Sequence, residues 1–334
     1  MSSSDTALPF ARPFYVMLKP AGSRCNLSCR YCYYMKKAQL YPAESRPAMS
    51  DELLELFTQQ YIEAQTQPEV LFTWHGGEPL LRPLSFYQRA LQLQQRYARG
   101  RHIDNCLQTN GTLLTDEWCR FFKENRFLIG ISIDGTRQMH EAYREPSFDR
   151  VMKGISLLKQ YGVEWNAMAT IHQANVHQPL EFFRFFRDMG CSYLQFTPIV
   201  ERTPDGRLTA ESVSADEWGT FLCRLFDEWV KDMFRTTGDR RWMMGEEDWM
   251  IIQLFDATLA NWCGVPPGVC SMAPECGQAT AMEWNGDLYS CDHFVSPAHR
   301  LGNIRLQTIT AMAYGERQRR FGQEKTHVAA SAVP

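Results

Sequence analysis

The sequence lacks any run of 18 apolar residues, so it predicts no membrane-spanning helix. Its net charge of −3 leaves no excess of basic side chains for binding nucleic acid or an anionic membrane. The N-terminal stretch MSSSDTALPFARPF lacks the basic and apolar regions of a secretory signal peptide. Repeats and low-complexity tracts are absent, and 44% hydrophobic residues suffice for a packed core. These absences favour a globular cytoplasmic protein.

Cysteine is the residue type in excess, with 11 in 334 residues. Disulfides are rare in the reducing cytoplasm. The cysteines of such a chain serve as metal ligands, in redox chemistry or in the core. The length fits two domains, or one large barrel with an appendage.

Apolar β-rich runs alternate with helical patterns over the first part of the chain. We expect strands at residues 14–19, 70–74, 103–109, 128–134, 164–171 and 193–198. We expect helices between them at residues 50–64, 84–99, 115–125, 148–161 and 179–189, with Ser50 and Thr115 as N-caps. This order predicts an α/β fold whose parallel sheet curls toward a barrel, with functional loops after the carboxyl ends of the strands.

The composition changes after about residue 200. A polar connection leads to two expected helices at 215–234 and 246–263, and then to a Cys/Gly/Pro-rich segment at 263–291. Within this segment, Asn285-Gly286 predicts the turn of a β-hairpin. We expect one domain at residues 10–205 and a second at 206–334.

The strongest local signal is Cys25-x3-Cys29-x2-Cys32, directly after the first expected strand. A structural zinc site uses four ligands, so three cysteines indicate a metal group with an open coordination position. A [4Fe–4S] cluster held by three cysteines keeps one iron free to bind a small molecule. Two alternatives stay open: a zinc-binding structural protein whose fourth ligand is distant, and three cysteines spaced by chance.

This motif, with an aromatic residue before the last cysteine, resembles the signature of the radical S-adenosylmethionine (SAM) superfamily. Further similar motifs follow the expected strands: Gly76-Gly77-Glu78-Pro79, Thr109-Asn110-Gly111 and Ser132-Ile133-Asp134-Gly135. The resemblance implies a partial (β/α)6 radical SAM barrel followed by a SPASM-like iron–sulfur domain. The residues implied in SAM binding are Tyr31, Gly77, Glu78, Ser132, Arg144 and the backbone near Val200.

The chemistry of these side chains agrees with that implication. Glycine at position 77 permits a close backbone approach to a ligand. Glu78 can pair with an ammonium group and Arg144 with a carboxylate, which are the two ends of a methionine-like group. Tyr31 can cover an adenine, and Ser132 can form a hydrogen bond with a ribose or carboxylate oxygen.

A second set, Cys270-x5-Cys276-x14-Cys291, resembles the SPASM extension of radical SAM enzymes that modify peptides. The whole pattern is similar to the anaerobic sulfatase-maturating enzymes. That resemblance implies oxidation of a cysteine or serine of a sulfatase to Cα-formylglycine, begun by a 5′-deoxyadenosyl radical that removes a Cβ hydrogen. It also implies a SAM-binding [4Fe–4S] cluster, auxiliary [4Fe–4S] clusters, and an electron donor such as flavodoxin or ferredoxin.

Asp292 directly follows Cys291. After hydrogen abstraction, the implied reaction still has to release one proton and one electron. A nearby carboxylate can accept that proton, so the resemblance implies that Asp292 is the catalytic base. The alternative is that Asp292 is a turn residue at the end of the hairpin.

The sequence departs from the family at two places. His75 stands where the family often has glutamine, which affects an expected substrate contact. The final residues THVAASAVP contain no cysteine, so we expect an apparent truncation that prevents the second auxiliary cluster and leaves the first with three cysteines. An inactive truncated member is therefore one alternative, and another SPASM enzyme that forms thioether or carbon–carbon crosslinks is a second.

The remaining side chains carry weaker signals. We expect buried structural thiols at Cys106, Cys119, Cys191, Cys223 and Cys263, with Cys263 also able to replace a missing cluster ligand. His172 and His177 are expected to cap a helix or face solvent. The pattern does not decide between cysteine and serine as the substrate residue.

Overall fold

The computed structural model describes residues 13–42, 45–203, 205–237 and 249–332. These residues form two compact units. Unit 1 takes its described residues from Met1–Arg24, Tyr34–Cys106 and Ala273–Pro334, and unit 2 takes them from Cys25–Tyr33 and Leu107–Met272.

Unit 1 is built on parallel strands extended by an antiparallel hairpin. Its strand order is β10-β9-β8-β1-β2, and β1 pairs in parallel with both β2 and β8. The strands are β1 (Tyr15–Lys19), β2 (Glu69–Trp74), β8 (Ala279–Glu283), β9 (Asp287–Tyr289) and β10 (Arg300–Asn303), with the first residues of β3 (His102–Thr109). The helices are α1 (Asp51–Ala64), α2 (Leu84–Tyr97), α9 (Ile309–Ala313) and α10 (Glu316–Ala332), and the short 3-10 helices η1 (Met35–Leu40), η2 (Pro79–Leu81) and η4 (Pro297–His299).

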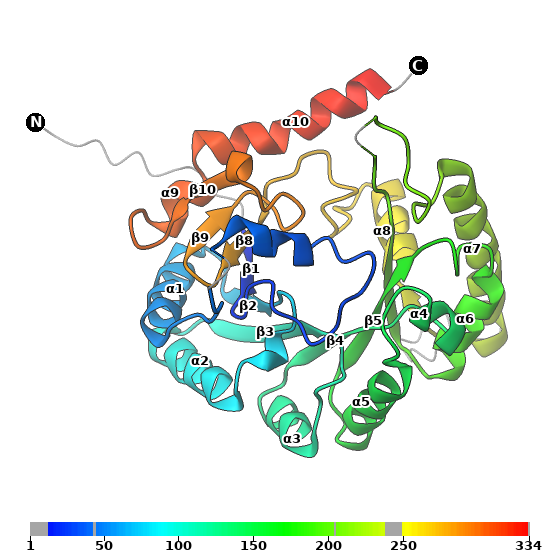
Figure 1. The fold of residues 1–334 in the computed structure, drawn as a ribbon, viewed down its shortest axis with the longest axis horizontal. Coiled ribbons are helices and arrows are strands. Elements are labelled where there is room, and N and C mark those ends of the chain that lie inside the picture. Colours follow the sequence, from blue (N-terminus) through cyan, green and yellow to red (C-terminus); the bar gives the residue numbers. More distant parts are fainter. Residues whose placement is uncertain (1–12, 43–44, 204, 238–248, 333–334) are drawn as a thin grey trace, which may run out of the picture. The chain divides into compact units, whose positions relative to one another are not determined.

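Aromatic side chains pack between α1 and the strands of unit 1. Phe57, Tyr61 and Phe72 are fully buried, and their ring centroids lie 5.1 to 5.9 Å apart. Each buried ring of this size stabilises the fold by roughly 1.5–3 kcal/mol through loss of apolar surface to water. Figure 1 shows α1 and α2 along the outer side of β1 and β2.

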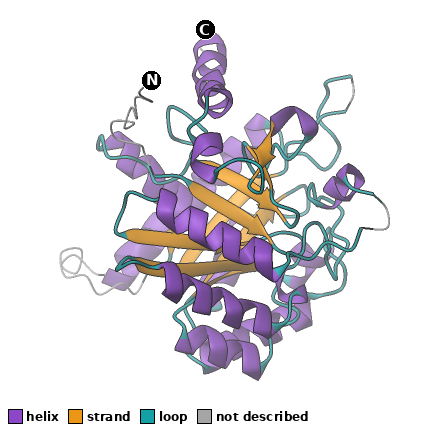
Figure 2. Cartoon of the chain, turned by 90° about the vertical axis from the view of Figure 1, so that its left-hand side faces the viewer, coloured by secondary structure: helices purple, strands orange, loops and turns teal. Residues whose placement is uncertain are grey.

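Unit 2 repeats the strand–helix order. β4 (Leu128–Ser132), β5 (Trp165–Ile171), β6 (Tyr193–Pro198) and β7 (Ile251–Ile252) pair in parallel in that order, with the last residues of β3. The helices are α3 (Asp116–Glu124), α4 (Arg137–Glu141), α5 (Phe148–Gln160), α6 (Pro179–Asp188), α7 (Ala215–Thr237) and α8 (Gln253–Trp262). In Figure 1, α3 and α5 lie on the outer side of these strands, as expected for parallel β–α–β crossovers. Figure 2, seen from the side of α1 and α2, shows helices in front of the strands there as well.

The predicted elements of the first 200 residues are confirmed. All six strands and all five helices form, with bounds that differ by about two residues at most. Both predicted caps are present, since Ser50 Oγ accepts from the Leu53 amide at 3.3 Å and Thr115 Oγ1 from the Trp118 amide at 3.4 Å. The predicted hairpin is β8–β9, and its turn residue Gly286 has φ of 91°.

The C-terminal part differs from the prediction in several elements. The helix expected at 246–263 begins at Gln253, because Ile251 and Ile252 pair with β6 as strand β7; residues 246–248 lie outside the described residues. Strand β10 and helices α9 and α10 were not predicted. The domain boundary at residue 205 stays a prediction.

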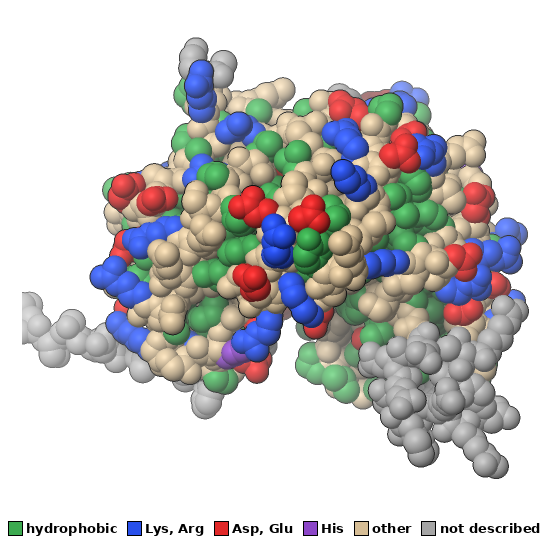
Figure 3. Space-filling view, turned by 90° about the horizontal axis from the view of Figure 1, so that it is seen from below, with side chains coloured by type: hydrophobic (Ala, Val, Ile, Leu, Met, Phe, Trp, Pro, Cys, Tyr) green, Lys and Arg blue, Asp and Glu red, His purple; other side chains and the backbone are tan. Residues whose placement is uncertain are grey.

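The surface carries charges of both signs. Figure 3 shows acidic and basic side chains interspersed on one face, which agrees with the net charge of −3. Among the described helices, none has the length and apolar character needed to cross a membrane.

Candidate active site

The cysteine loop of unit 2 is fastened by hydrogen bonds to the turn after β3. Asn110 Nδ2 donates to Asn26 Oδ1 at 2.9 Å, and Asn26 Nδ2 donates to Thr112 Oγ1 at 2.8 Å. Within the loop, the Leu27 amide donates to Cys25 Sγ at 3.4 Å, and the Cys32 amide donates to the Cys29 carbonyl at 3.1 Å. The Thr-Asn-Gly motif found in the sequence therefore shapes the loop that carries the three cysteines.

The three thiols of this loop lie close enough to influence one another. Burial raises the pKa of Cys29 to about 11; the positive charge of Arg144 opposes this rise, and the neighbouring Cys32 and Cys25 add to it. Thiolates crowded in this way suit a cationic iron–sulfur group, which compensates their charge. Among the described residues, no three Cys, His, Asp or Glu side chains converge on a site for a single metal ion. In a [4Fe–4S] cluster each cysteine binds a different iron, so the donor set fits that group.

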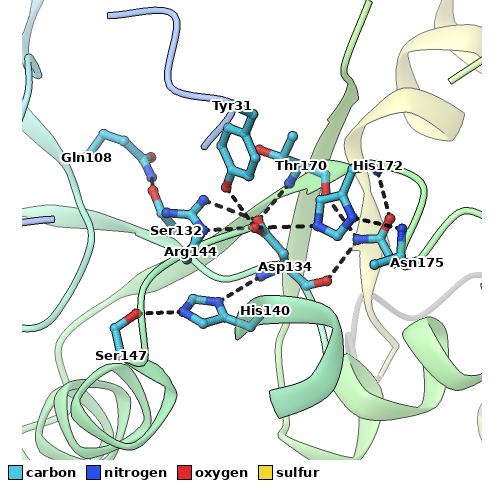
Figure 4. A network of polar contacts seen from close by, with 11 residues as sticks. Tyr31, Gln108, Ser132, Asp134, His140, Arg144, Ser147, Thr170, His172 and Asn175 are labelled. Atoms are coloured by element: carbon cyan, nitrogen blue, oxygen red, sulfur yellow. Dashed lines mark hydrogen bonds and ion pairs between the residues drawn. The ribbon is translucent and has the colours of Figure 1, made fainter. Parts of the chain in front are cut away.

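Asp134 is the centre of a buried network in unit 2 (Figure 4). Its carboxylate is fully buried and accepts from Arg144 Nε at 2.8 Å, Arg144 Nη2 at 3.1 Å, Tyr31 Oη at 2.7 Å and the Thr170 amide at 2.9 Å. Burial alone would raise the pKa of Asp134, but Arg144 outweighs that effect and holds the pKa below its usual value. Asp134 is therefore ionised and orients both Arg144 and Tyr31.

Two neutral histidines flank Asp134. Burial lowers the pKa of both His140 and His172 to about 4. His140 Nε2 lies 3.0 Å from Ser147 Oγ. The His172 ring stacks on Tyr143 with centroids 4.1 Å apart, and its Nδ1 accepts from the Ala174 amide at 3.2 Å.

The expectation that His172 caps a helix or faces solvent is wrong. The side chain is completely buried, and its Nε2 lies 3.9 Å from Asp134 Oδ2 without a hydrogen-bond partner among the described residues. His177 is exposed as expected, and its Nε2 lies 3.3 Å from Glu217 Oε1. A histidine after a strand is too common to reveal such a contact from the sequence alone.

Ser132 and Val200, the other residues of unit 2 implied in SAM binding, have different contacts from Arg144 and Tyr31. Ser132 Oγ accepts from Gln108 Nε2 at 2.9 Å. Gly130 makes room for Gln108, because an added Cβ would lie inside contact distance of the Gln108 amide oxygen. Val200 follows β6 with its side chain 59% exposed, so its expected contribution rests on its backbone. The SAM contacts of all these residues stay predictions.

The Gly-Gly-Glu-Pro motif forms a tight turn in unit 1. The Gly77 amide donates to the Gly22 carbonyl at 2.8 Å, and the Glu78 amide donates to the Arg24 carbonyl at 2.7 Å. An added Cβ at Gly77 would collide with the Arg24 backbone, so only glycine fits. The Glu78 side chain is fully buried and caps η2 by accepting from the Leu80 amide at 2.9 Å.

The Lys19 cluster of unit 1 consists of Lys19, His75 and Asp292. Lys19 is completely buried, and its ammonium forms an ion pair with Asp292. Lys19 Nζ also lies 3.1 Å from His75 Nδ1 and 4.3 Å from the centroid of the Tyr34 ring. Nearby, Tyr34 Oη donates a hydrogen bond to Glu283, whose pKa is raised chiefly by burial. The sequence indicated Asp292 and His75 but gave no sign that Lys19 joins them.

The three cysteines implied in an auxiliary cluster differ in exposure. Cys270 belongs to unit 2 and is exposed, whereas Cys276 and Cys291 belong to unit 1 and are half-buried. The Cys276 amide donates to the Gly322 carbonyl at 3.1 Å, which ties this segment to α10. Their service as cluster ligands stays a prediction.

The other five cysteines are free thiols of two kinds. Cys119 and Cys191 are buried and Cys106 is half-buried, in agreement with a structural role. The expectation of buried thiols is wrong for Cys223 and Cys263, which are exposed.

Comparisons with known proteins agree with this geometry. The model of the radical SAM superfamily matches residues 20–186, and that of an iron–sulfur cluster-binding domain, SPASM, matches residues 274–331. The chain is 54% identical to a serine-type anaerobic sulfatase-maturating enzyme of Bacteroides thetaiotaomicron, covering 96% of this chain and 80% of that protein. It is 31% identical to a cysteine-type enzyme of Clostridium novyi, covering 89% of this chain and 78% of that protein.

A solved structure of native anSMEcpe with bound AdoMet has the same fold. The TM-score is 0.83 at 28% identity, and the match covers 94% of this chain and 84% of that chain. The predicted α/β fold, a partial (β/α)6 barrel with a SPASM-like domain, is thereby confirmed.

Fold and motifs thus define a radical SAM protein with an iron–sulfur extension. Within that superfamily, the chain belongs to the family of anaerobic sulfatase-maturating enzymes.

Proposed function

We propose that this chain oxidises a serine side chain of a sulfatase polypeptide to Cα-formylglycine. The observation that carries the proposal is the 54% identity to a serine-type enzyme over 96% of the chain. A second serine-type relative, from Klebsiella aerogenes, is 37% identical over 94% of the chain, whereas the cysteine-type relative of Clostridium novyi is 31% identical. We therefore expect serine to be preferred over cysteine.

Cys25, Cys29 and Cys32 would hold the [4Fe–4S] cluster that binds SAM. With SAM bound, that cluster supplies the electron that yields methionine and a 5′-deoxyadenosyl radical able to remove a Cβ hydrogen. Cys270, Cys276 and Cys291 would serve an auxiliary cluster that accepts an electron. The residues assigned to SAM are Tyr31, Gly77, Glu78, Ser132, Arg144 and the backbone of Val200.

The buried network of unit 2 supports the assignment of Arg144 and Tyr31. Asp134 holds the Arg144 guanidinium through Nε and Nη2, which leaves its Nη1 group for a ligand carboxylate. The same carboxylate fixes the Tyr31 hydroxyl, so the ring has one orientation for contact with a flat base.

Asp292 would accept the proton. Conversion of a serine CH2OH group to an aldehyde removes one hydrogen atom from Cβ, one proton from the hydroxyl and one further electron. Asp292 is 7% exposed and paired with Lys19, so its carboxylate is ionised and able to take the hydroxyl proton. The burial of Asp292 also keeps bulk water from competing for the base.

The partners and location follow from this assignment. The substrate would be a sulfatase polypeptide, and the electrons would come from a small donor such as flavodoxin or ferredoxin. The cysteines that would bind clusters have to stay reduced, as they do in the cytoplasm, which supports a cytoplasmic location. The family matches at 20–186 and 274–331 support a barrel domain at 10–205 and a SPASM-like domain at 206–334.

The test is anaerobic turnover of the reconstituted protein with SAM, a reductant and peptides carrying Ser, Cys or Ala at the target position. We expect 5′-deoxyadenosine and a serine peptide lighter by two hydrogens, with an aldehyde that reacts with hydrazine reagents. Triple replacement of Cys25, Cys29 and Cys32 by alanine should abolish both products. An internal crosslink in the peptide would overturn the proposal, as would stoichiometric zinc without iron and without SAM cleavage.

A further inference from the structure

Lys19, at the end of β1, has a buried side chain although it carries a charge. Its side chain is completely buried, and strand register places it opposite Glu283 of β8. Burial of an ammonium group is unfavourable unless it is paired, and here the partner is Asp292. A buried ion pair contributes little net stability compared with apolar side chains of the same volume. A functional role therefore explains the ion pair of Lys19 with Asp292 better than a contribution to folding stability does.

The second contact of Lys19 fixes the proton of His75. The His75 amide donates to the Leu18 carbonyl at 2.8 Å, which holds this residue beside β1. His75 Nδ1 lies 2.8 Å from the Gly76 amide nitrogen and 3.1 Å from Lys19 Nζ. A backbone amide only donates, so Nδ1 is an acceptor without a proton. Burial and the charge of Lys19 lower the pKa of His75 to about 4, so the ring is neutral and its proton lies on Nε2.

The close approach of Lys19 to the turn after β2 requires glycine at position 76. Gly76 has φ of 132°, and an added Cβ would lie 2.9 Å from the Gly22 carbonyl oxygen and 3.6 Å from Lys19 Cα. On the other side, the ring of Tyr34 lies against the Lys19 ammonium. The Lys19 side chain is thus confined between β1, the turn after β2 and the Tyr34 ring.

We propose that Lys19 is a positioning residue whose ammonium holds Asp292 as a hydrogen-bond acceptor and locks His75 as an Nε2–H donor. The inference rests on the proposed function, because it concerns how the serine hydroxyl is recognised. A hydroxyl donates one hydrogen bond and accepts others, which matches an acceptor and a donor presented together. A thiol is weak in both roles. The Lys19 cluster therefore selects a seryl side chain over a cysteinyl one.

The test compares peptide binding and turnover in the reconstituted holoenzyme with SAM. Binding of Ser and Ala peptides is measured without reductant, and turnover of Ser and Cys peptides with reductant. We expect the wild-type protein to bind the Ser peptide about tenfold more tightly than the Ala peptide, the factor typical of hydrogen bonds to charged groups. Lys19→Met, which keeps the length and removes the charge, should reduce that preference below about twofold.

Turnover gives a readout that loss of structure alone would not produce. In Lys19→Met, we expect 5′-deoxyadenosine to form at near the wild-type rate while formylglycine falls at least about tenfold. Lys123→Met is the matched control, because Lys123 is exposed and its Nζ donates to the Gly162 carbonyl. It should leave binding, coupling and peptide preference unchanged.

A second variant covers the case in which Lys19→Met does not fold. His75→Leu leaves the ion pair of Lys19 with Asp292 in place, and it should lower the ratio of kcat/KM for Ser over Cys peptides several-fold. The positioning role of Lys19 is overturned if Lys19→Met keeps the wild-type peptide preference and the wild-type ratio of formylglycine to 5′-deoxyadenosine. If Lys19→Met does not fold, the same result in His75→Leu overturns it. If the wild-type protein oxidises neither peptide, the proposed function fails, and the Ser-against-Ala binding comparison still decides the role of Lys19.

Discussion

The guanidinium of Arg144 donates two hydrogen bonds to the carboxylate of Asp134, from Nε at 2.8 Å and from Nη2 at 3.1 Å. Both side chains are almost completely enclosed, at 9% and 0% exposure. The Asp134 carboxylate also accepts from the Tyr31 hydroxyl and the Thr170 backbone amide, so one buried carboxylate binds groups from three other parts of unit 2.

Asp134→Asn should destabilise the protein by about 3–5 kcal/mol, because it leaves the Arg144 charge buried without its counter-ion. The loss would appear as a lower midpoint in chemical denaturation of the full chain. Arg137 and Asp149 form a matched control pair on the surface, where solvent screens the charges. Asp149→Asn should leave the midpoint almost unchanged, and equal effects of the two substitutions would refute the central role of Asp134.

Gly77→Ala should disrupt the turn after β2, because the added Cβ would collide with the Arg24 backbone. Backbone cannot yield as a flexible side chain does, so we expect a loss of SAM binding together with lower stability. Equilibrium dialysis with labelled SAM and thermal denaturation measure the two effects. Gly219 in α7 provides the control, since nothing lies within 4 Å of an added Cβ there. Gly219→Ala should stabilise the helix by up to about 1 kcal/mol, and a similar gain at Gly77 would contradict the collision.

Acid should destabilise the protein through its buried histidines. The pKa of His172 is about 4 in the folded protein, below its usual value of 6.5, because burial disfavours the charged ring. The unfolded chain therefore binds the extra proton first as pH falls. The stability is fully present above about pH 6.5 and is lost as pH decreases toward 4, by up to about 1.4 kcal/mol per pH unit for one proton.

His172→Phe tests this source of acid sensitivity. Phenylalanine keeps the stacking on Tyr143 and removes a buried Nε2 that lacks a hydrogen-bond partner among the described residues. We expect denaturation midpoints at neutral pH to be retained or raised, and their decline between pH 6.5 and 4 to become shallower. His177→Gln removes an exposed histidine and serves as the control. An unchanged slope in His172→Phe would show that other groups cause the acid sensitivity.

The sequence predicted the elements that depend on local pattern and missed the contacts that depend on tertiary packing. Apolar, β-rich runs located the first six strands, and serine or threonine before paired acids located two helix starts. The cysteine spacing and the glycine motif identified the superfamily. Lys19 could not be identified, because a lysine at a strand end is normally solvated. Its burial depends on Asp292, which is 273 positions later in the chain (292 − 19).

Strand β7 illustrates the same limit. Two β-branched residues before an apolar helical pattern extend that pattern, and only pairing with β6 draws Ile251 and Ile252 into the sheet. The sequence also did not predict the hydrogen-bond network around Asp134 in unit 2. Asp134 appeared only as part of a motif, and its partners Tyr31 and Arg144 come from separate segments.

Asp292→Asn should separate SAM cleavage from peptide oxidation. The amide retains the shape of the carboxylate but cannot accept the hydroxyl proton, so formylglycine formation should fall by about 10²–10⁴-fold while 5′-deoxyadenosine still forms. Glu283 offers a matched control within unit 1, because it is a second buried carboxyl that faces Tyr34. Burial raises the pKa of Glu283, so its amide replacement resembles the protonated side chain and Glu283→Gln should keep most of the product yield. Mass spectrometry of the peptide and chromatography of 5′-deoxyadenosine give the two yields. Equal losses of product in both variants would argue against Asp292 as the specific base, because the loss of any buried carboxyl group in this region would then explain the effect.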